Sequence, residues 1–187
     1  QDVWLALDNG VLKRGNAKGL YKVKASLPPH LDAIAAGQAG LFADHVDDDG
    51  LVVLRVGPSG SLAATWTVPD EHDLYLLAPG LDGGAVAGLT RGRILLLRPD
   101  GTHQELGDDD NGAAQTEALA VAQDAGFVLA GAMGDTRLRA WAWRDGAVIG
   151  GWEFGAPTSD IVTSADGSTI LAGSMDGVLH RVTLRGP

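Results

Sequence analysis

Four acidic residues stand at the start of short apolar runs, and their side chains could bind an ion. They are Asp32, Asp73, Glu117 and Asp160. Carboxylate oxygens are the ligands that calcium prefers in proteins. If the four runs are equivalent strands, the carboxylates form a ring that could hold calcium. Solvated strand ends are the simpler explanation of the same residues, and a calcium titration would separate the two.

A second group of polar residues falls in acidic or glycine-rich stretches between apolar runs, where tight turns are expected. Their side chains carry both signs of charge, which suits a protein partner better than a nucleic acid. These candidate binding residues are Asp8, Asn9, Asp47, Asp48, Asp49, Arg91, Arg93, Asp135 and Asp176. They can act together only if the turns of successive units meet at one end of the fold.

The sequence contains no recognisable catalytic set. The chain has no cysteine, which excludes disulfides, thiolate metal sites and cysteine nucleophiles. It has neither a Gly-x-Ser-x-Gly elbow nor a phosphate-binding loop ending in Gly-Lys-Ser/Thr. No two histidines are three or four residues apart, as paired metal ligands on a helix would be. These observations favour a non-catalytic protein without deciding whether the chain is an enzyme.

Charge and hydropathy limit the partners. Twenty-four acidic and 14 basic residues give a net charge of −10, which repels phosphate backbones and anionic lipid surfaces. The apolar runs are far shorter than the roughly 20 residues that a membrane-spanning helix needs. We therefore expect a soluble, acidic protein that binds neither nucleic acid nor membrane. A cysteine-free chain suits both redox regimes, so a cytoplasmic location is expected, with a secreted or periplasmic one as the alternative.

The chain is built from similar units, each with an apolar run, a tight turn and a second apolar run. Five turn anchors are separated by 40, 42, 43 and 42 residues; they are Gly10, Gly50, Gly92, Asp135 and Gly177. Further alternating runs lie between them, and Asp-Gly pairs supply the residues that tight hairpins need. No apolar pattern of helical period is sustained. Each unit therefore predicts four short strands and almost no helix.

A period of about 42 residues with four strands per unit is typical of the blades of a β-propeller, because one blade buries its faces only against its neighbours. We predict one all-β domain over residues 1–187, a β-propeller of about 4.5 four-stranded blades. Two strands in the first unit and four in each later one make about eighteen, which leaves sheet edges open. The units are an incomplete one at 1–26, then 27–65, 69–106, 116–154 and 158–187.

Two stretches resemble the WD-repeat family, and the resemblance extends over nearly the whole chain. Residues 164–179, Ser-Ala-Asp-Gly-Ser-Thr-Ile-Leu-Ala-Gly-Ser-Met-Asp-Gly-Val-Leu, resemble the family's central pattern of turn, strand, acidic turn and strand. His30-Leu-Asp-Ala-Ile followed by Asp48-Asp-Gly resembles its opening histidine and later turn aspartate. The Gly-His and Trp-Asp pairs of the family are absent. The resemblance implies that His30 forms a buried hydrogen bond with Asp48 or Asp49.

Propellers bind partners at the ends of the ring, where the turns of several blades converge. We therefore expect a non-catalytic scaffold that mediates protein–protein interaction through the turn residues named above, without a cofactor. The alternative is a propeller enzyme or ligand-binding protein with an ion, such as calcium, or a cofactor in the central channel. The open sheet edges also predict a protein partner, and another chain that completes the propeller is one candidate.

Overall fold

Antiparallel strands make up nearly all of the described chain. The computed structural model describes residues 3–6, 11–16, 19–27, 33–69, 74–107 and 115–184. Within these ranges eighteen strands form five sheets, and the single helical element is a 3-10 turn, η1 (Leu81–Gly83). The prediction of an all-β chain with almost no helix is confirmed. Across the same ranges no helix is long and apolar enough to cross a bilayer.

Each sheet is formed by strands that are consecutive in the sequence and paired in chain order. The first sheet contains β1 (Val3–Ala6), β2 (Val11–Asn16) and β3 (Gly19–Ser26). The second contains β4 (Ile34–Gly37), β5 (Gly40–Asp47), β6 (Gly50–Val56) and β7 (Leu62–Pro69). The third contains β8 (Leu74–Pro79), β9 (Ala85–Leu89), β10 (Ile94–Leu97) and β11 (His103–Leu106). The fourth contains β12 (Thr116–Ala122), β13 (Phe127–Ala132), β14 (Arg137–Ala142) and β15 (Val148–Glu153), and the fifth β16 (Thr158–Thr163), β17 (Ile170–Ser174) and β18 (Leu179–Val182).

The strands are not distributed among the sheets as the sequence predicted. Three sheets have four strands, and the first and last have three. Two strands were expected in the opening unit, and the overlooked one is β3. It alternates Tyr21 and Val23 with Lys22 and Lys24, and lysine weakens the β-strand signal. In the last unit the described residues form three strands where four were expected.

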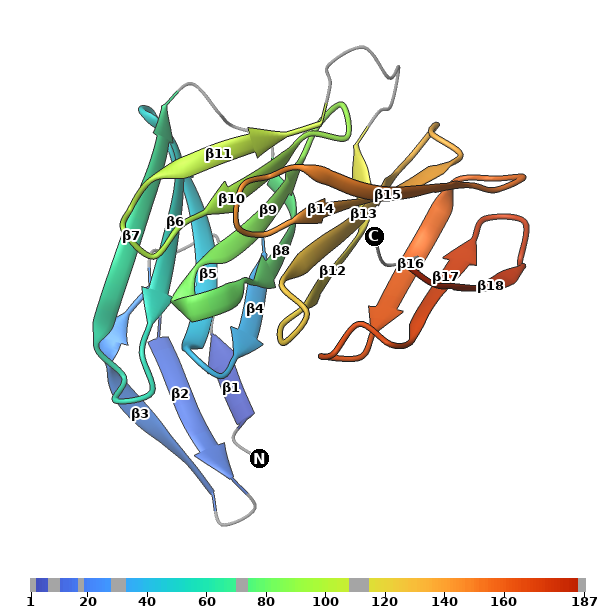
Figure 1. The fold of residues 1–187 in the computed structure, drawn as a ribbon. Coiled ribbons are helices and arrows are strands. Elements are labelled where there is room, and N and C mark those ends of the chain that lie inside the picture. The colour runs from blue at the N-terminus through green and yellow to red at the C-terminus, as the bar shows by residue number, and fades with distance from the viewer. Residues whose placement is uncertain are drawn as a thin grey trace.

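The sheets follow one another around an open arc (Figure 1). The first strands of neighbouring sheets, β4, β8, β12 and β16, contact one another along the chain of sheets. The first sheet, in blue, and the last sheet, in red, stand apart at the two ends of the drawing. The sheets are therefore arranged as the predicted blades would be, and the described strands do not close a ring.

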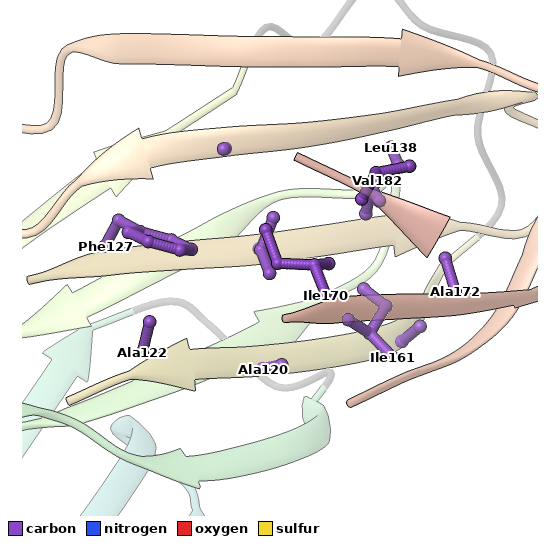
Figure 2. Packing of buried hydrophobic residues seen from close by; sticks show 11 residues of the cluster. Ala120, Ala122, Phe127, Leu138, Ile161, Ile170, Ala172 and Val182 are labelled. Carbon is purple, nitrogen blue, oxygen red and sulfur yellow. The ribbon is translucent and has the colours of Figure 1, made fainter. Parts of the chain in front are cut away.

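Three hydrophobic clusters fill the three interfaces between the second and the fifth sheets. Phe42 and Trp66 pack on the third sheet, and the Nε1 atom of Trp66 donates a 2.6 Å hydrogen bond to the Arg98 carbonyl. Trp141 and Trp143 are buried between the third and fourth sheets. Both tryptophans therefore pack between neighbouring sheets. The remaining cluster, drawn in Figure 2, joins the fourth sheet to the fifth.

The fifth sheet buries only one of its two faces. Ile161 and Ile170 point into the cluster of Figure 2 and are buried there. Val162 and Leu179, on strands of the same sheet, are 61% and 69% exposed. The third sheet, in contrast, contributes to two clusters, one on each face.

A glycine in the second strand allows the next sheet to come close. In the third sheet Gly88 lies against Thr116 of β12, and a Cβ on the glycine would be 2.7 Å from the Thr116 Cγ2 atom. Gly131 of the fourth sheet lies against Thr158 of β16 in the same way. Both threonines precede a register shift in their strands. The glycine that follows alanine in the second strand, Gly88 or Gly131, therefore marks the contact with the next sheet.

Candidate functional site

The turns between the second and third strands of four sheets hold most of the residues that the sequence predicted to bind a partner. Because equivalent strands of successive sheets pack in the same order, these turns project from one end of the arc. We name this surface the turn end; it comprises residues 48–49, 90–93, 133–136 and 175–178. Asp8 and Asn9 lie outside the described residues.

The turn between β5 and β6 is a two-residue hairpin. Asp47 pairs with Gly50 at its base, and Gly50 has a φ of 133°, a backbone that favours glycine. Asp48 and Asp49 form the exposed tip, while the side chain of Asp47 lies outside the described part of the chain. His30 lies outside it as well, so its pairing with Asp48 or Asp49 stays a prediction.

The turn between β9 and β10 exposes one arginine and pairs the other. Arg91 has a φ of 57° and Gly92 a φ of 69°. The left-handed backbone is costly for a residue with a Cβ, so Arg91 is held in a strained position with its side chain exposed. Arg93 instead forms an ion pair with Glu105 across β10 and β11, with 2.6 Å between Nε and Oε1. Arg91 is therefore the residue of this turn that presents positive charge to a partner.

Asp135 lies in the turn between β13 and β14 but points inward. It is buried, and its Oδ1 atom accepts hydrogen bonds from the Arg137 backbone N–H at 3.0 Å and from Arg137 Nε at 2.9 Å. Arg139 adds a second ion pair at 3.4 Å. Asp135 therefore fixes the turn and orients two arginines, and it does not itself face a partner.

Asp176 belongs to a small polar network in the turn between β17 and β18. The Ser174 hydroxyl donates to Asp176 Oδ1, and this hydrogen bond is the main reason that the pKa of Asp176 is lowered. The Ser174 Oγ atom also lies 3.2 Å from His180 Nε2, and the His180 ring stacks on Phe154 with 4.0 Å between ring centroids.

This grouping of serine, histidine and aspartate does not have the geometry of a catalytic triad. A triad needs the aspartate to orient the imidazole, which then takes the proton of the serine. Here Asp176 accepts from Ser174 instead, and Ser174 is buried. The network therefore closes the turn, as the acidic turn of the sequence pattern predicted.

Two exposed methionines at the turn end were not among the predicted binding residues. Met133 and Met175 are 39% and 48% exposed. They are equivalent, because the N–H of each donates to a carbonyl just before the first strand of its own sheet, that of Gln115 and that of Pro157. The sequence signal was the repeated Leu-Ala-Gly-x-Met, which indicated a repeat but not that its methionine is exposed. Val178, also exposed, follows in the last turn.

The four acidic residues predicted to form a ring are only partly within the described chain. Asp32 and Asp73 lie outside it. Glu117 is half-buried and accepts a hydrogen bond from Gln115 Nε2, and exposed Asp160 accepts one from the Ile161 N–H at 2.8 Å. The residues that the structure describes contain no group of three metal-ligating side chains.

Glu117 and Asp160 do not share one strand position. Asp160 pairs with Gly173, and the residue paired with the equivalent Gly131 is Ala118. Glu117 sits at the register shift before Ala118. The two strands have the same register shift, so Thr116 is equivalent to Thr158 and Glu117 to Ser159. The predicted equivalence of Glu117 and Asp160 is therefore one residue out. Calcium binding stays an untested prediction.

Comparison with known proteins gives the fold but no sequence family. No family model and no curated protein matches the sequence. A structure titled "Structure of Dos1 propeller" is similar over 94% of this chain and 47% of its own, at 13% identity and a TM-score of 0.73. A chain in "Crystal Structure of Mitotic Checkpoint Complex" is similar over 97% of this chain and 59% of its own, at 14% identity and a TM-score of 0.71.

The chain has a β-propeller fold. It spans about half the length of the chains it matches, 47% of one and 59% of the other. Its sheets are thus blades, and the turn end is one of the two ends at which the blade turns of a propeller collect.

Proposed function

We propose that this propeller is a non-catalytic scaffold that binds a partner protein through its turn end. The observation that carries the proposal is the pair of exposed methionines, Met133 and Met175, at equivalent places in adjacent blades. Methionine side chains are flexible and polarisable, and they are common on surfaces that adapt to a partner. Exposed Val178 extends the apolar surface in the last blade.

Charge at the turn end supports a specific protein contact. Exposed Asp48 and Asp49 lie in one blade and exposed Arg91 in the next, so a partner meets both signs of charge. Complementary charges steer association and fix the orientation of a complex more than they raise its affinity. The apolar residues supply the buried area, at about 25 cal/mol per Å² of apolar surface removed from water.

The similar structures are consistent with this role. One of them is a chain of a mitotic checkpoint complex, so a propeller of this shape occurs in an assembly of several proteins. The net charge of −10 favours a protein partner over a phosphate backbone.

Site-specific photocrosslinking tests the proposal. A photoreactive amino acid is placed at Met175 at the turn end or at Ala165, an exposed residue in the turn between β16 and β17 at the other end. In extracts of the native cells we expect a defined partner to crosslink from position 175 and not from 165. The M133K/M175K variant, with a probe at Val178, should lose that partner. Equal crosslinking from both ends would contradict the proposal.

A further inference from the structure

A cavity of about 700 Å³ opens between the second and third blades, at the end opposite the turn end. Its wall is formed by the ends of β4, β6 and β8, by the turns that follow them, and by Gln123 of the fourth blade. Gln123 Nε2 donates a 2.8 Å hydrogen bond to the Pro79 carbonyl. This bond joins the fourth blade to the third at the edge of the cavity. The cavity shares no residue with the turn end, so an inference drawn from it does not depend on the function proposed above.

Arg55 supplies the positive charge in this wall. Its Nη1 atom donates a 2.7 Å hydrogen bond to the Gly83 carbonyl of the next blade. Its Nε atom is shielded from water and has no acceptor. No carboxylate of the described residues forms an ion pair with it. A buried N–H without an acceptor costs free energy, and a ligand oxygen would remove that cost.

The arginine departs from the repeat. Arg55 pairs with Phe42 across β5 and β6, and the residue at the equivalent place of the third blade is buried Leu96, which pairs with Val86. In the fifth blade Arg181 takes this position, and it is exposed because no blade follows it in the described chain. Arg55 is therefore a charged residue at a position that the following blade covers, whereas the third blade has an apolar residue there.

Arg98 is an arginine of the third blade that also contacts the following blade, and its guanidinium has more hydrogen-bond partners than that of Arg55. It also bridges two blades, since its Nη1 atom donates to the Trp143 carbonyl. Its Nη2 atom donates to Gln104 Oε1 at 2.8 Å, and the guanidinium lies 5.1 Å from the centre of the Trp143 ring. Both sides of that guanidinium are occupied by the protein. Arg55 differs because, among the residues that the structure describes, its Nη1 atom alone has an acceptor.

The backbone opposite Arg55 is shaped around its guanidinium. A Cβ on Gly83 would lie 1.7 Å from the Arg55 Nη1 atom, and Gly83 has a φ of 86°. Asp82 precedes it with a φ of 53°, a strained value for a residue with a side chain. Two successive left-handed residues thus hold the loop where Arg55 meets it. Such strain is concentrated at binding sites.

We infer that the Arg55 cavity binds a carboxylate group. The Nε and Nη2 atoms form the edge of an arginine that donates two parallel hydrogen bonds to a planar carboxylate. Gly83 leaves this edge unused, and because Nε is shielded from water, the guanidinium has to turn toward the cavity to present the edge to a ligand. Asp82 is exposed in the same wall, so a dianion such as phosphate meets repulsion there. Pro58 and Pro79 add apolar wall for a short aliphatic chain. A small organic acid and the carboxyl terminus of a peptide both have this chemistry.

Titration followed by NMR tests the inference. The side-chain Nε–H signals of the arginines are recorded while acetate, the peptide Gly-Gly-Ala, its carboxyl-amidated form or inorganic phosphate is added. We expect the Arg55 signal to shift saturably with acetate and with the free peptide, and not with the amidated peptide. Tighter binding of the peptide than of acetate identifies a peptide terminus as the source of the carboxylate. Equal binding identifies a small organic acid.

Matched variants complete the test. R55L and R55K lack the Arg55 signal, so binding by all variants is followed on the backbone N–H signals of Asp82 and Gly83. R55L introduces the residue type found at the equivalent Leu96 and should weaken acetate binding about tenfold or more. R55K keeps the charge without the planar fork and should also bind more weakly. R144L removes an exposed charge away from the cavity and should bind like the wild type. The inference is overturned if neither carboxylate moves the Arg55 signal, if phosphate binds more tightly than acetate, or if R55L or R55K binds like the wild type.

Discussion

Thr158 occupies the space that a side chain on Gly131 would need. A Cβ built on Gly131 comes 2.6 Å from the Thr158 Cβ atom, a distance that packed carbon atoms do not tolerate. The same contact joins Gly88 to Thr116 one blade earlier. The distance between neighbouring blades is therefore set by a glycine in one blade and by the threonine side chain that packs on it from the next blade.

Replacing Gly131 by alanine should lower the free energy of unfolding by about 2 kcal/mol, because one added carbon in a packed interface forces the blades apart. Chemical denaturation measures the loss. G173A is the matched control, since the equivalent glycine of the last blade has as its nearest neighbour the Ser159 Oγ atom, at 3.5 Å. Similar losses in the two variants would show that blade contact is not the cause.

The two threonines at these contacts should respond differently to valine. Thr116 Oγ1 lies 3.1 Å from the Leu89 carbonyl and 3.2 Å from that of Arg93, whereas Thr158 Oγ1 is buried without a hydrogen-bond partner. We expect T116V to cost about 1 kcal/mol of stability and T158V to be neutral or stabilising. Denaturation of both variants checks this, and a larger loss in T158V would contradict it.

Relief of backbone strain at Arg91 should stabilise the propeller. Asparagine tolerates a left-handed backbone better than arginine does, so R91N should raise the free energy of unfolding by about 1 kcal/mol. Thermal melting measures the change. Arg144, which is exposed and has no positive φ, provides the control, and R144N should give no such gain.

Stability should fall at acid pH through three Asp-Gly turns. Hydrogen bonds from neighbouring hydroxyls, of Thr102, Ser164 and Ser174, lower the pKa of Asp100, Asp166 and Asp176. A carboxyl whose pKa is lowered by folding adds stability above its ordinary value of 3.8, and this contribution disappears as pH falls through the lower folded pKa.

The triple variant D100N/D166N/D176N checks the direction of this effect. Melting temperatures of the variant and the wild type should differ most at roughly pH 5 and converge toward about pH 2, where the wild-type carboxyls are protonated. A difference that stays constant over this range would exclude these three groups as the cause.

Calcium binding at the four acidic residues can be tested directly by calorimetry. If Asp32, Asp73, Glu117 and Asp160 hold an ion, calcium should give saturable heat that the E117Q/D160N variant loses. A titration without binding heat would favour solvated strand ends.

The repeat and its turns could be predicted from the sequence because they depend on local chemistry. Asp-Gly pairs mark turns in which Gly167 and Gly177 have positive φ values, and the constant spacing of such anchors predicts blades. The exact strand position of a residue, in contrast, depends on pairing with another strand. Glu117 and Asp160 both stand at the start of an apolar run, and only the pairs with Gly131 and Gly173 show that they are one residue out of step.

The contacts that define the sites could not be predicted in this way. Arg55 and Gly83 are 28 residues apart in the sequence and meet only when two blades pack. In the sequence Arg55 is one arginine in an alternating strand, and its covered position appears only beside the following blade. The exposure of Met133 and Met175 likewise depends on which side of each turn faces solvent.

The open arc makes this propeller behave as a one-dimensional array. Each blade is held by its immediate neighbours, so the third blade, packed on both faces, resists opening more than the fifth, which is packed on one. Free energy in such an array is a sum of unit terms and nearest-neighbour couplings. Within the described residues we therefore expect the fifth blade to open before the third, and the amide hydrogens of the third blade to exchange more slowly than those of the fifth.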